Sequence, residues 1–144
     1  MFYGEYSHSI DAKGRTIIPS RLRNSLGDTF YLTKGLDRCL LAYAAEDWQE
    51  FESKLKELPQ TTNANARKLV RHFLGGAKEV ESDSQGRTLI PPNLREYAGL
   101  TKDVVFIGMG NRIEIWSKER YETEGTYEDM DEVAGALEDM GLSI

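Results

Sequence analysis

The chain contains the same short segment twice. Residues 11–27 align without gaps on residues 83–99, at a constant offset of 72. Nine of the seventeen aligned positions are identical, whereas two unrelated segments of average composition would share about one. Beyond this segment the likeness weakens, and residues 30–32 are matched with residues 105–107. A fixed period of this kind indicates that the chain duplicates one structural unit.

Each copy predicts the same order of local structure. A lead-in strand is followed by an Asp-x-x-Gly-Arg turn and a short β-branched run. A proline then ends the strand and opens a short helix, after which a glycine favours a left-handed cap. A second hairpin completes the unit. We expect lead-in strands at 2–10 and 77–82, helices at 20–26 and 92–98, and hairpins pairing 29–33 with 39–43 and 104–107 with 112–116.

Two amphipathic helices are expected between the copies, at 46–58 and 63–74. Their apolar stripes consist of Trp48, Phe51, Leu55 and Leu58 in the first and Leu69, Val70, Phe73 and Leu74 in the second. This order predicts an α+β fold with the two copies packed about a pseudo-two-fold axis, because one copy cannot fill a core alone. The expected domains are 1–60, the first repeat with its C-terminal helix; 61–75, a linking helix; 76–122, the second repeat; and 123–144, an acidic tail.

Charge is distributed unevenly along the chain. The net charge is −6, but residues 119–144 alone hold −8, so residues 1–118 carry +2. A slightly basic body is compatible with DNA binding without demanding it. The tail is expected to be either a loose acidic helix or disordered.

Several functions are disfavoured by what the sequence lacks. It has no run of about 18 apolar residues, so no membrane span is expected. Its single cysteine permits no intrachain disulfide, which fits a reducing cytoplasm, and its two histidines lack the partners of a zinc site. No phosphate-binding glycine loop, nucleophile elbow or His-Glu-x-x-His motif is present, so we expect neither an enzyme nor a cofactor.

The motifs taken together resemble the MraZ family of bacterial regulators, which carry two tandem SpoVT–AbrB domains. The likeness rests on the N-terminal Met-Phe-x-Gly, the paired Asp-x-x-Gly-Arg loops, Gly-Leu-Asp-x-Cys-Leu at 35–40 and Asn-Arg-Ile-Glu-Ile-Trp at 111–116. It covers nearly the whole chain and fades in the tail. The resemblance implies an AbrB-like swapped-hairpin β-barrel with both halves from one chain. It also implies a ring-shaped homo-oligomer at the nucleoid that represses its own division and cell-wall operon, by binding G-rich direct repeats in double-stranded DNA.

Arg15 and Arg87 are the leading candidates for contact with such DNA. The planar fork of arginine bonds two acceptors at once, and its pairing with O6 and N7 of guanine is the commonest specific contact. Lys13 stands beside Arg15, whereas Gln85 takes the equivalent place beside Arg87. The two copies are therefore not expected to read DNA identically.

The remaining motif residues are expected to shape the loops. Asp11 and Asp83 bond forward to backbone amides, while Gly14 and Gly86 take positive φ. In a simpler interpretation, the two loop arginines only form turn salt bridges with these aspartates, and such surface pairs contribute little.

Three further arginines are candidate DNA contacts on the short helices. Arg23 and Arg95 occupy matching positions, and a structural role suits them as well as DNA contact does. Arg21 is matched by Asn93, which makes a shared role doubtful.

Two functions other than regulation stay open. An oligomeric scaffold that binds a protein partner would suit the acidic tail. An AbrB-type antitoxin is a variant of this alternative, although such antitoxins usually carry one copy of the motif.

Overall fold

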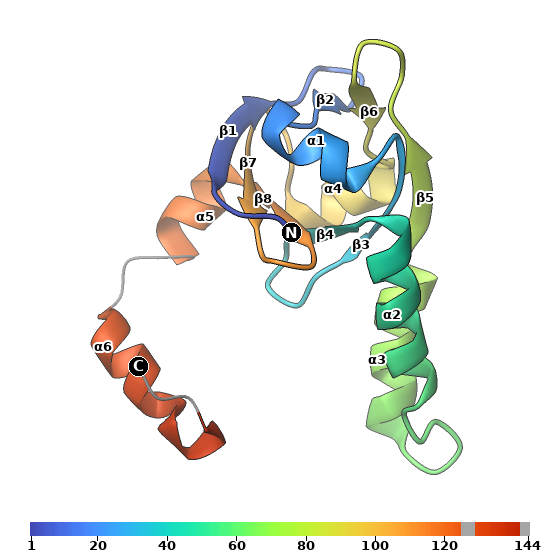
Figure 1. The fold of residues 1–144 in the computed structure, drawn as a ribbon, viewed down its shortest axis with the longest axis vertical. Coiled ribbons are helices and arrows are strands. Elements are labelled where there is room, and N and C mark those ends of the chain that lie inside the picture. Colours follow the sequence, from blue (N-terminus) through green and yellow to red (C-terminus); the bar gives the residue numbers. More distant parts are fainter. Residues whose placement is uncertain (125–128, 142–144) are drawn as a thin grey trace.

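The computed structural model describes residues 1–124 and 129–141, and its fold is α+β, as the sequence predicts (Figure 1). The strands are β1 (Glu5–Ser9), β2 (Arg15–Ile17), β3 (Thr29–Lys34), β4 (Leu40–Tyr43), β5 (Lys78–Glu81), β6 (Arg87–Leu89), β7 (Asp103–Gly108) and β8 (Ile113–Ser117). Six of them form one sheet in the order β1-β7-β8-β4-β3-β5, and β2 with β6 forms a two-stranded ribbon.

Strands of the two repeats interleave throughout. Strand β1 of the first repeat pairs with β7 of the second, and β3 of the first pairs with β5 of the second. The other two inter-repeat pairs, β2 with β6 and β4 with β8, join equivalent strands. In the ribbon, Thr16 lies opposite Thr88, its own counterpart 72 residues later. The pairing is therefore reciprocal about a pseudo-two-fold axis through the ribbon, and neither repeat builds its sheet alone.

The ribbon connects the two edges of the larger sheet. An isolated bridge joins Ile10, at the end of β1, to Thr16, and a second joins Ser82, at the end of β5, to Thr88. The Thr16 hydroxyl donates to the carbonyl of Ser9 at 2.8 Å, and the hydroxyls of Ser82 and Thr88 lie 3.0 Å apart. These bonds satisfy the buried threonines and hold the ribbon against the body.

The strand register corrects one part of the sequence alignment. Tyr6 pairs with Phe106, and Lys78, the counterpart of Tyr6, pairs with Leu32. Leu32 is therefore equivalent to Phe106, and the match of residues 30–32 with 105–107 is wrong by one position. Both Leu32 and Phe106 are fully buried, whereas Ile107 faces the opposite side of the sheet. The connection into β7 is thus two residues longer than the one into β3, a difference that apolar pattern alone does not reveal.

The helices are α1 (Ser20–Leu26), α2 (Ala45–Lys56), α3 (Ala64–Gly75), α4 (Pro92–Ala98), α5 (Lys118–Glu124), α6 (Met130–Ala136) and the 3-10 turn η1 (Glu138–Met140). The predicted spans of α1 and α4 are confirmed. Gly99 takes the expected left-handed conformation, with φ 66° and ψ 31°. The same prediction is wrong for Gly27, whose ψ of 169° leads the chain directly into β3. Among the described helices, none is long and apolar enough to cross a membrane.

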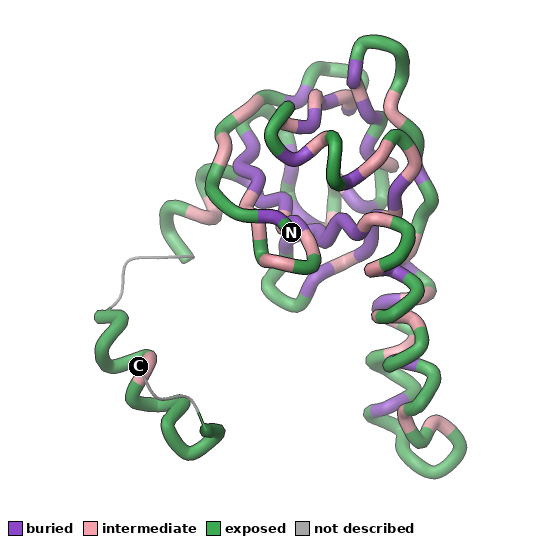
Figure 2. The backbone as a smooth tube through the Cα atoms, in the orientation of Figure 1, coloured by how far each residue is buried: buried purple, intermediate pink, exposed green. Residues whose placement is uncertain are grey.

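Apolar side chains form two clusters, one on each face of the large sheet. The first fills the body between the sheet, α1 and α4, and includes Phe30, Leu32, Leu94 and Phe106. The second lies on the opposite face, partly under α2 and α3 and partly beside α5, where Trp116 meets Tyr121. Helices α2 and α3 project from the body as a helical hairpin (Figure 2).

The stripe predicted for the first linking helix is confirmed, since Trp48 and Leu55 are buried and Phe51 packs beside them. The stripe predicted for the second is wrong at one position. Leu69 is exposed, because Ala66 and Phe73 define the side of α3 that packs inward.

For the acidic tail the sequence predicts either a loose helix or disorder. Residues 125–128 and 142–144 lie outside the described residues. In the described part, α6 and η1 contain no buried residue.

Candidate functional site

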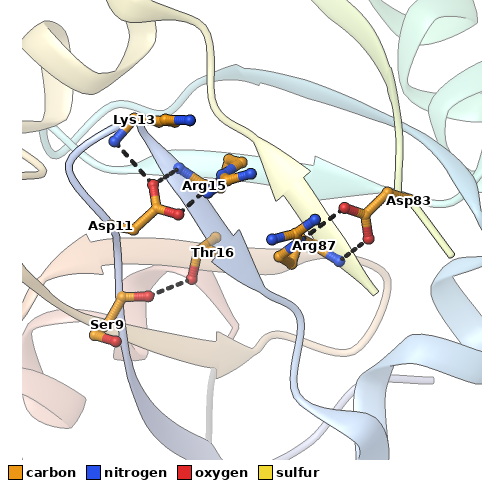
Figure 3. Close-up of polar contacts among 7 residues, drawn as sticks. All are labelled: Ser9, Asp11, Lys13, Arg15, Thr16, Asp83 and Arg87. Carbon is orange, nitrogen blue, oxygen red and sulfur yellow. Dashed lines mark hydrogen bonds and ion pairs between the residues drawn. The ribbon is translucent and has the colours of Figure 1, made fainter. Parts of the chain in front are cut away.

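The first Asp-x-x-Gly-Arg segment forms a tight loop between β1 and β2 (Figure 3). One carboxylate oxygen of Asp11 accepts hydrogen bonds from the backbone amides of Lys13 and Arg15, both at 2.9 Å. The amide of Gly14 donates to the Asp11 carbonyl at 2.9 Å, and the φ of Gly14 is +87°. The aspartate and the glycine together therefore fix the turn that presents Arg15.

The second loop repeats this geometry between β5 and β6. Asp83 accepts from the amides of Gln85 and Arg87, both at 2.9 Å. Gly86 donates to the Asp83 carbonyl at 3.0 Å and has a φ of +79°. Identical residues thus produce identical backbone bonds in both copies, although one loop carries Lys13 and the other Gln85, both exposed.

Each loop arginine forms an ion pair with the aspartate of its own loop and still has donor groups that can bind another molecule. The Nε atom of Arg15 donates to Asp11 at 2.9 Å, and that of Arg87 donates to Asp83 at 2.8 Å. About a third of each arginine side chain is exposed, at 32% and 35%. Within the described residues, the terminal Nη groups of both arginines donate no hydrogen bond to a protein group. The salt bridges expected from the simpler interpretation therefore orient the arginine side chains through Nε and leave the Nη groups able to donate to another molecule.

Both arginines project from one surface of the ribbon. Thr16 and Thr88 are buried, so the residues on either side of them in β2 and β6 face outward. Arg15 lies opposite Leu89, and Arg87 lies opposite Ile17. We call these four outward residues the ribbon face. A hollow of about 130 Å³ beside it is lined by both arginines, so the two repeats contribute to a single site.

Two residues of the ribbon face were missed by the sequence reasoning. Leu89 is 53% exposed and Ile17 is half-buried. The signal was available in the alternation of Arg-Thr-Ile and Arg-Thr-Leu, which places the apolar residue on the same side as the arginine.

The helix arginines lie in different environments. Arg21, on the first turn of α1, is exposed, as is its counterpart Asn93. Arg23 and Arg95 are half-buried and bond to the carbonyls of Ile18 and Ile90. Of the five candidate arginines, all in the part of the chain that the structure describes, Arg15 and Arg87 are the two that lie together on the ribbon face.

Acid is expected to loosen both loops. The backbone bond from Arg15 is the largest cause that holds the pKa of Asp11 below its ordinary value of 3.8, and the bond from Arg87 does the same for Asp83. A carboxyl with a lowered folded-state pKa adds stability above pH 3.8, which is lost as the pH falls through the folded-state value. We expect Asp83→Asn to lower the urea midpoint at neutral pH and to converge with the parent in acid. A difference that stayed constant with pH would contradict this cause.

The family model that matches this chain and the similar proteins compared with it all carry the same family name. The family model described as "MraZ protein, putative antitoxin-like" matches residues 1–71 and 73–135. A protein of Lachnoclostridium phytofermentans named transcriptional regulator MraZ is 55% identical over 143 residues, which cover 99% of each chain. Proteins of the same name from Acetivibrio thermocellus and Clostridium beijerinckii are 58% identical over 130 residues and 52% identical over 143. These alignments cover 90% of both chains in the first case, and 99% of this chain and 100% of its relative in the second.

Proposed function

This chain belongs to the MraZ family, and from that premise we propose that it is a transcription regulator that binds double-stranded DNA through its ribbon face. The observation that carries the proposal is the presence of Arg15 and Arg87, from different repeats, on one surface with their Nη groups unbonded by the described residues. The names of the relatives support the same class of function.

The proposed recognition uses the shape of the ribbon. The major groove of DNA admits a two-stranded β-ribbon, and each arginine there can bond O6 and N7 of a guanine. Leu89 and Ile17 offer apolar contact to a neighbouring thymine methyl group. Lys13 and Arg21 are assigned to phosphates and Gln85 to a base edge. Asp11 and Asp83 order the loops and are assigned no DNA contact, because phosphate repels a carboxylate.

A single chain presents few cations, so we propose that binding depends on a ring-shaped homo-oligomer. Once one ribbon face is bound, the next is held near its own site at high effective concentration. Head-to-tail subunits match direct repeats in DNA, and the proposed target is a set of G-rich repeats in the promoter of the protein's own division and cell-wall operon. An open hollow of about 600 Å³ on the outer side of the sheet, with exposed Leu36 and Met109, offers apolar surface to a neighbouring copy. Repression from this site would place the protein at the nucleoid.

A gel-shift titration with the protein's own upstream DNA tests the proposal directly. We expect tight binding at low salt and a linear fall of log affinity with log salt, because phosphate contacts release counterions. DNA of the same length with each guanine of the repeats replaced serves as the control and is expected to bind weakly. Absence of binding at low salt would contradict the proposal and favour a scaffold that holds a protein partner.

A further inference from the structure

Arg23 and Arg95 lie behind the loops rather than on the ribbon face. Arg23 donates from Nε and Nη2 to the carbonyl of Ile18, at 3.2 and 2.9 Å. Arg95 donates from Nε to the carbonyl of Ile90 at 2.9 Å. Each of these isoleucines follows the ribbon strand of its own repeat, so both guanidinium groups are fixed close to the ribbon.

Each guanidinium also packs against the loop of the other repeat. A Cβ atom placed on Gly14 would lie 2.6 Å from Nε and 2.8 Å from Nη1 of Arg95. A Cβ on Gly86 would lie 3.1 Å from Cζ of Arg23. The contacts are therefore crossed, with the second-repeat helix supporting the first loop and the first-repeat helix supporting the second.

The first loop is supported more closely than the second. The amide of Ile90 donates to the carbonyl of Gly14 at 2.9 Å, so the same residue that accepts from Arg95 also holds the loop glycine. The spacing at Gly14 is also tighter than that at Gly86. Positive φ disfavours a side chain at both glycines. A side chain at Gly14 would also displace the guanidinium of Arg95, whereas at Gly86 a smaller shift of Arg23 would make room.

We propose that Arg23 and Arg95 are positioning residues that act across the pseudo-two-fold axis, each setting the loop that presents the other repeat's DNA-contacting arginine. Arg95 supports the loop of Arg15, and Arg23 supports the loop of Arg87. The part that concerns DNA rests on the proposed function, whereas the crossed support is a property of the fold.

Hydrogen–deuterium exchange of the full chain tests the crossing. Arg95→Ala removes the guanidinium that packs against Gly14 and the bond to Ile90, whose amide holds the Gly14 carbonyl. Peptides covering residues 11–15 are therefore expected to exchange about tenfold faster, while those covering 83–87 stay unchanged. Arg23→Ala is expected to give the converse. Arg95→Lys, which keeps the charge but not the planar group, is expected to behave as Arg95→Ala does and serves if the alanine variant fails to fold. Faster exchange in the loop of the same repeat, or in neither loop, would overturn the proposal.

A double-mutant cycle tests the contact itself. The effects of Gly14→Ala and Arg95→Ala on the urea midpoint are expected to be non-additive, because the second change removes the group that the new Cβ would meet. Gly14→Ala combined with Arg23→Ala is the matched control and is expected to be additive. Coupling of Gly14 to Arg23 rather than to Arg95 would contradict the crossing.

The salt dependence of DNA binding separates positioning from direct contact. If Arg95 touched a phosphate, its removal would lower the slope of log affinity against log salt by about one. For a positioning residue, affinity falls while the slope stays that of the parent. A lowered slope with unchanged exchange would overturn the proposal. If the parent itself binds no DNA, the proposed function fails, and exchange with the double-mutant cycle still decides the crossed support.

Discussion

Replacing both Arg15 and Arg87 by alanine is expected to abolish sequence-specific DNA binding while leaving the fold intact. A bidentate contact to guanine is worth about 1–3 kcal/mol, so the pair corresponds to a loss of at least ~30-fold in affinity for one ribbon face. In a ring the loss is larger, because every subunit that engages the same DNA loses its contacts together. Gel shifts with the upstream DNA measure the effect.

Stability is expected to change little in this variant. Both ion pairs are partly exposed, with arginine side chains 32% and 35% accessible, and pairs of this kind contribute little to stability. Arg67→Ala is the matched control, since Arg67 is an exposed arginine on the projecting helix α3. A double variant that keeps the parent's oligomeric state and its affinity would refute the assignment of the ribbon face.

Phe106→Ala is expected to destabilise the whole body by about 3–5 kcal/mol, the usual cost of removing a buried phenylalanine. Phe106 is fully buried, and its strand β7 pairs with β1 of the other repeat. Since the two repeats share one sheet and one core, both are expected to unfold in a single transition. Circular dichroism and tryptophan fluorescence in urea should then give coincident curves.

The two probes report on different parts of the molecule. Trp48 and Trp116 belong to the second cluster, on the opposite face of the sheet from Phe106. Met140→Ala is the control, since Met140 is 82% exposed and its loss should cost little. Separate transitions for the two probes would mean that the second cluster unfolds apart from the rest of the body, and would contradict a single transition.

Local structure was predictable where prolines and glycines that end a strand or form a turn recur at the same positions of both repeats. Pro19 and Pro91 precede helices whose spans match the predictions, and the glycine of each loop takes the positive φ that the motif indicates. The register of β7 was not predictable, because a connection longer by two residues leaves the apolar alternation ambiguous.

The site was predictable only in part. Duplication of the motif pointed to Arg15 and Arg87 as candidate DNA contacts, since a residue repeated at the same place in both units is hard to attribute to chance. The duplication could not decide whether Arg23 and Arg95 have a structural role or contact DNA. Their partners, Gly86 and Gly14, are far away in sequence, and only the interleaved strands bring them into contact.

The unlike halves of the ribbon face give the molecule a polarity. A symmetric dimer would present the same residues after a half-turn and could not distinguish one direction along DNA from the other. Here a half-turn exchanges Lys13 with Gln85 and Leu89 with Ile17, while Arg15 and Arg87 replace each other. The two ends of the ribbon face therefore differ, and a DNA site that matches it has a direction. Successive copies of the protein are expected to face the same way along the duplex.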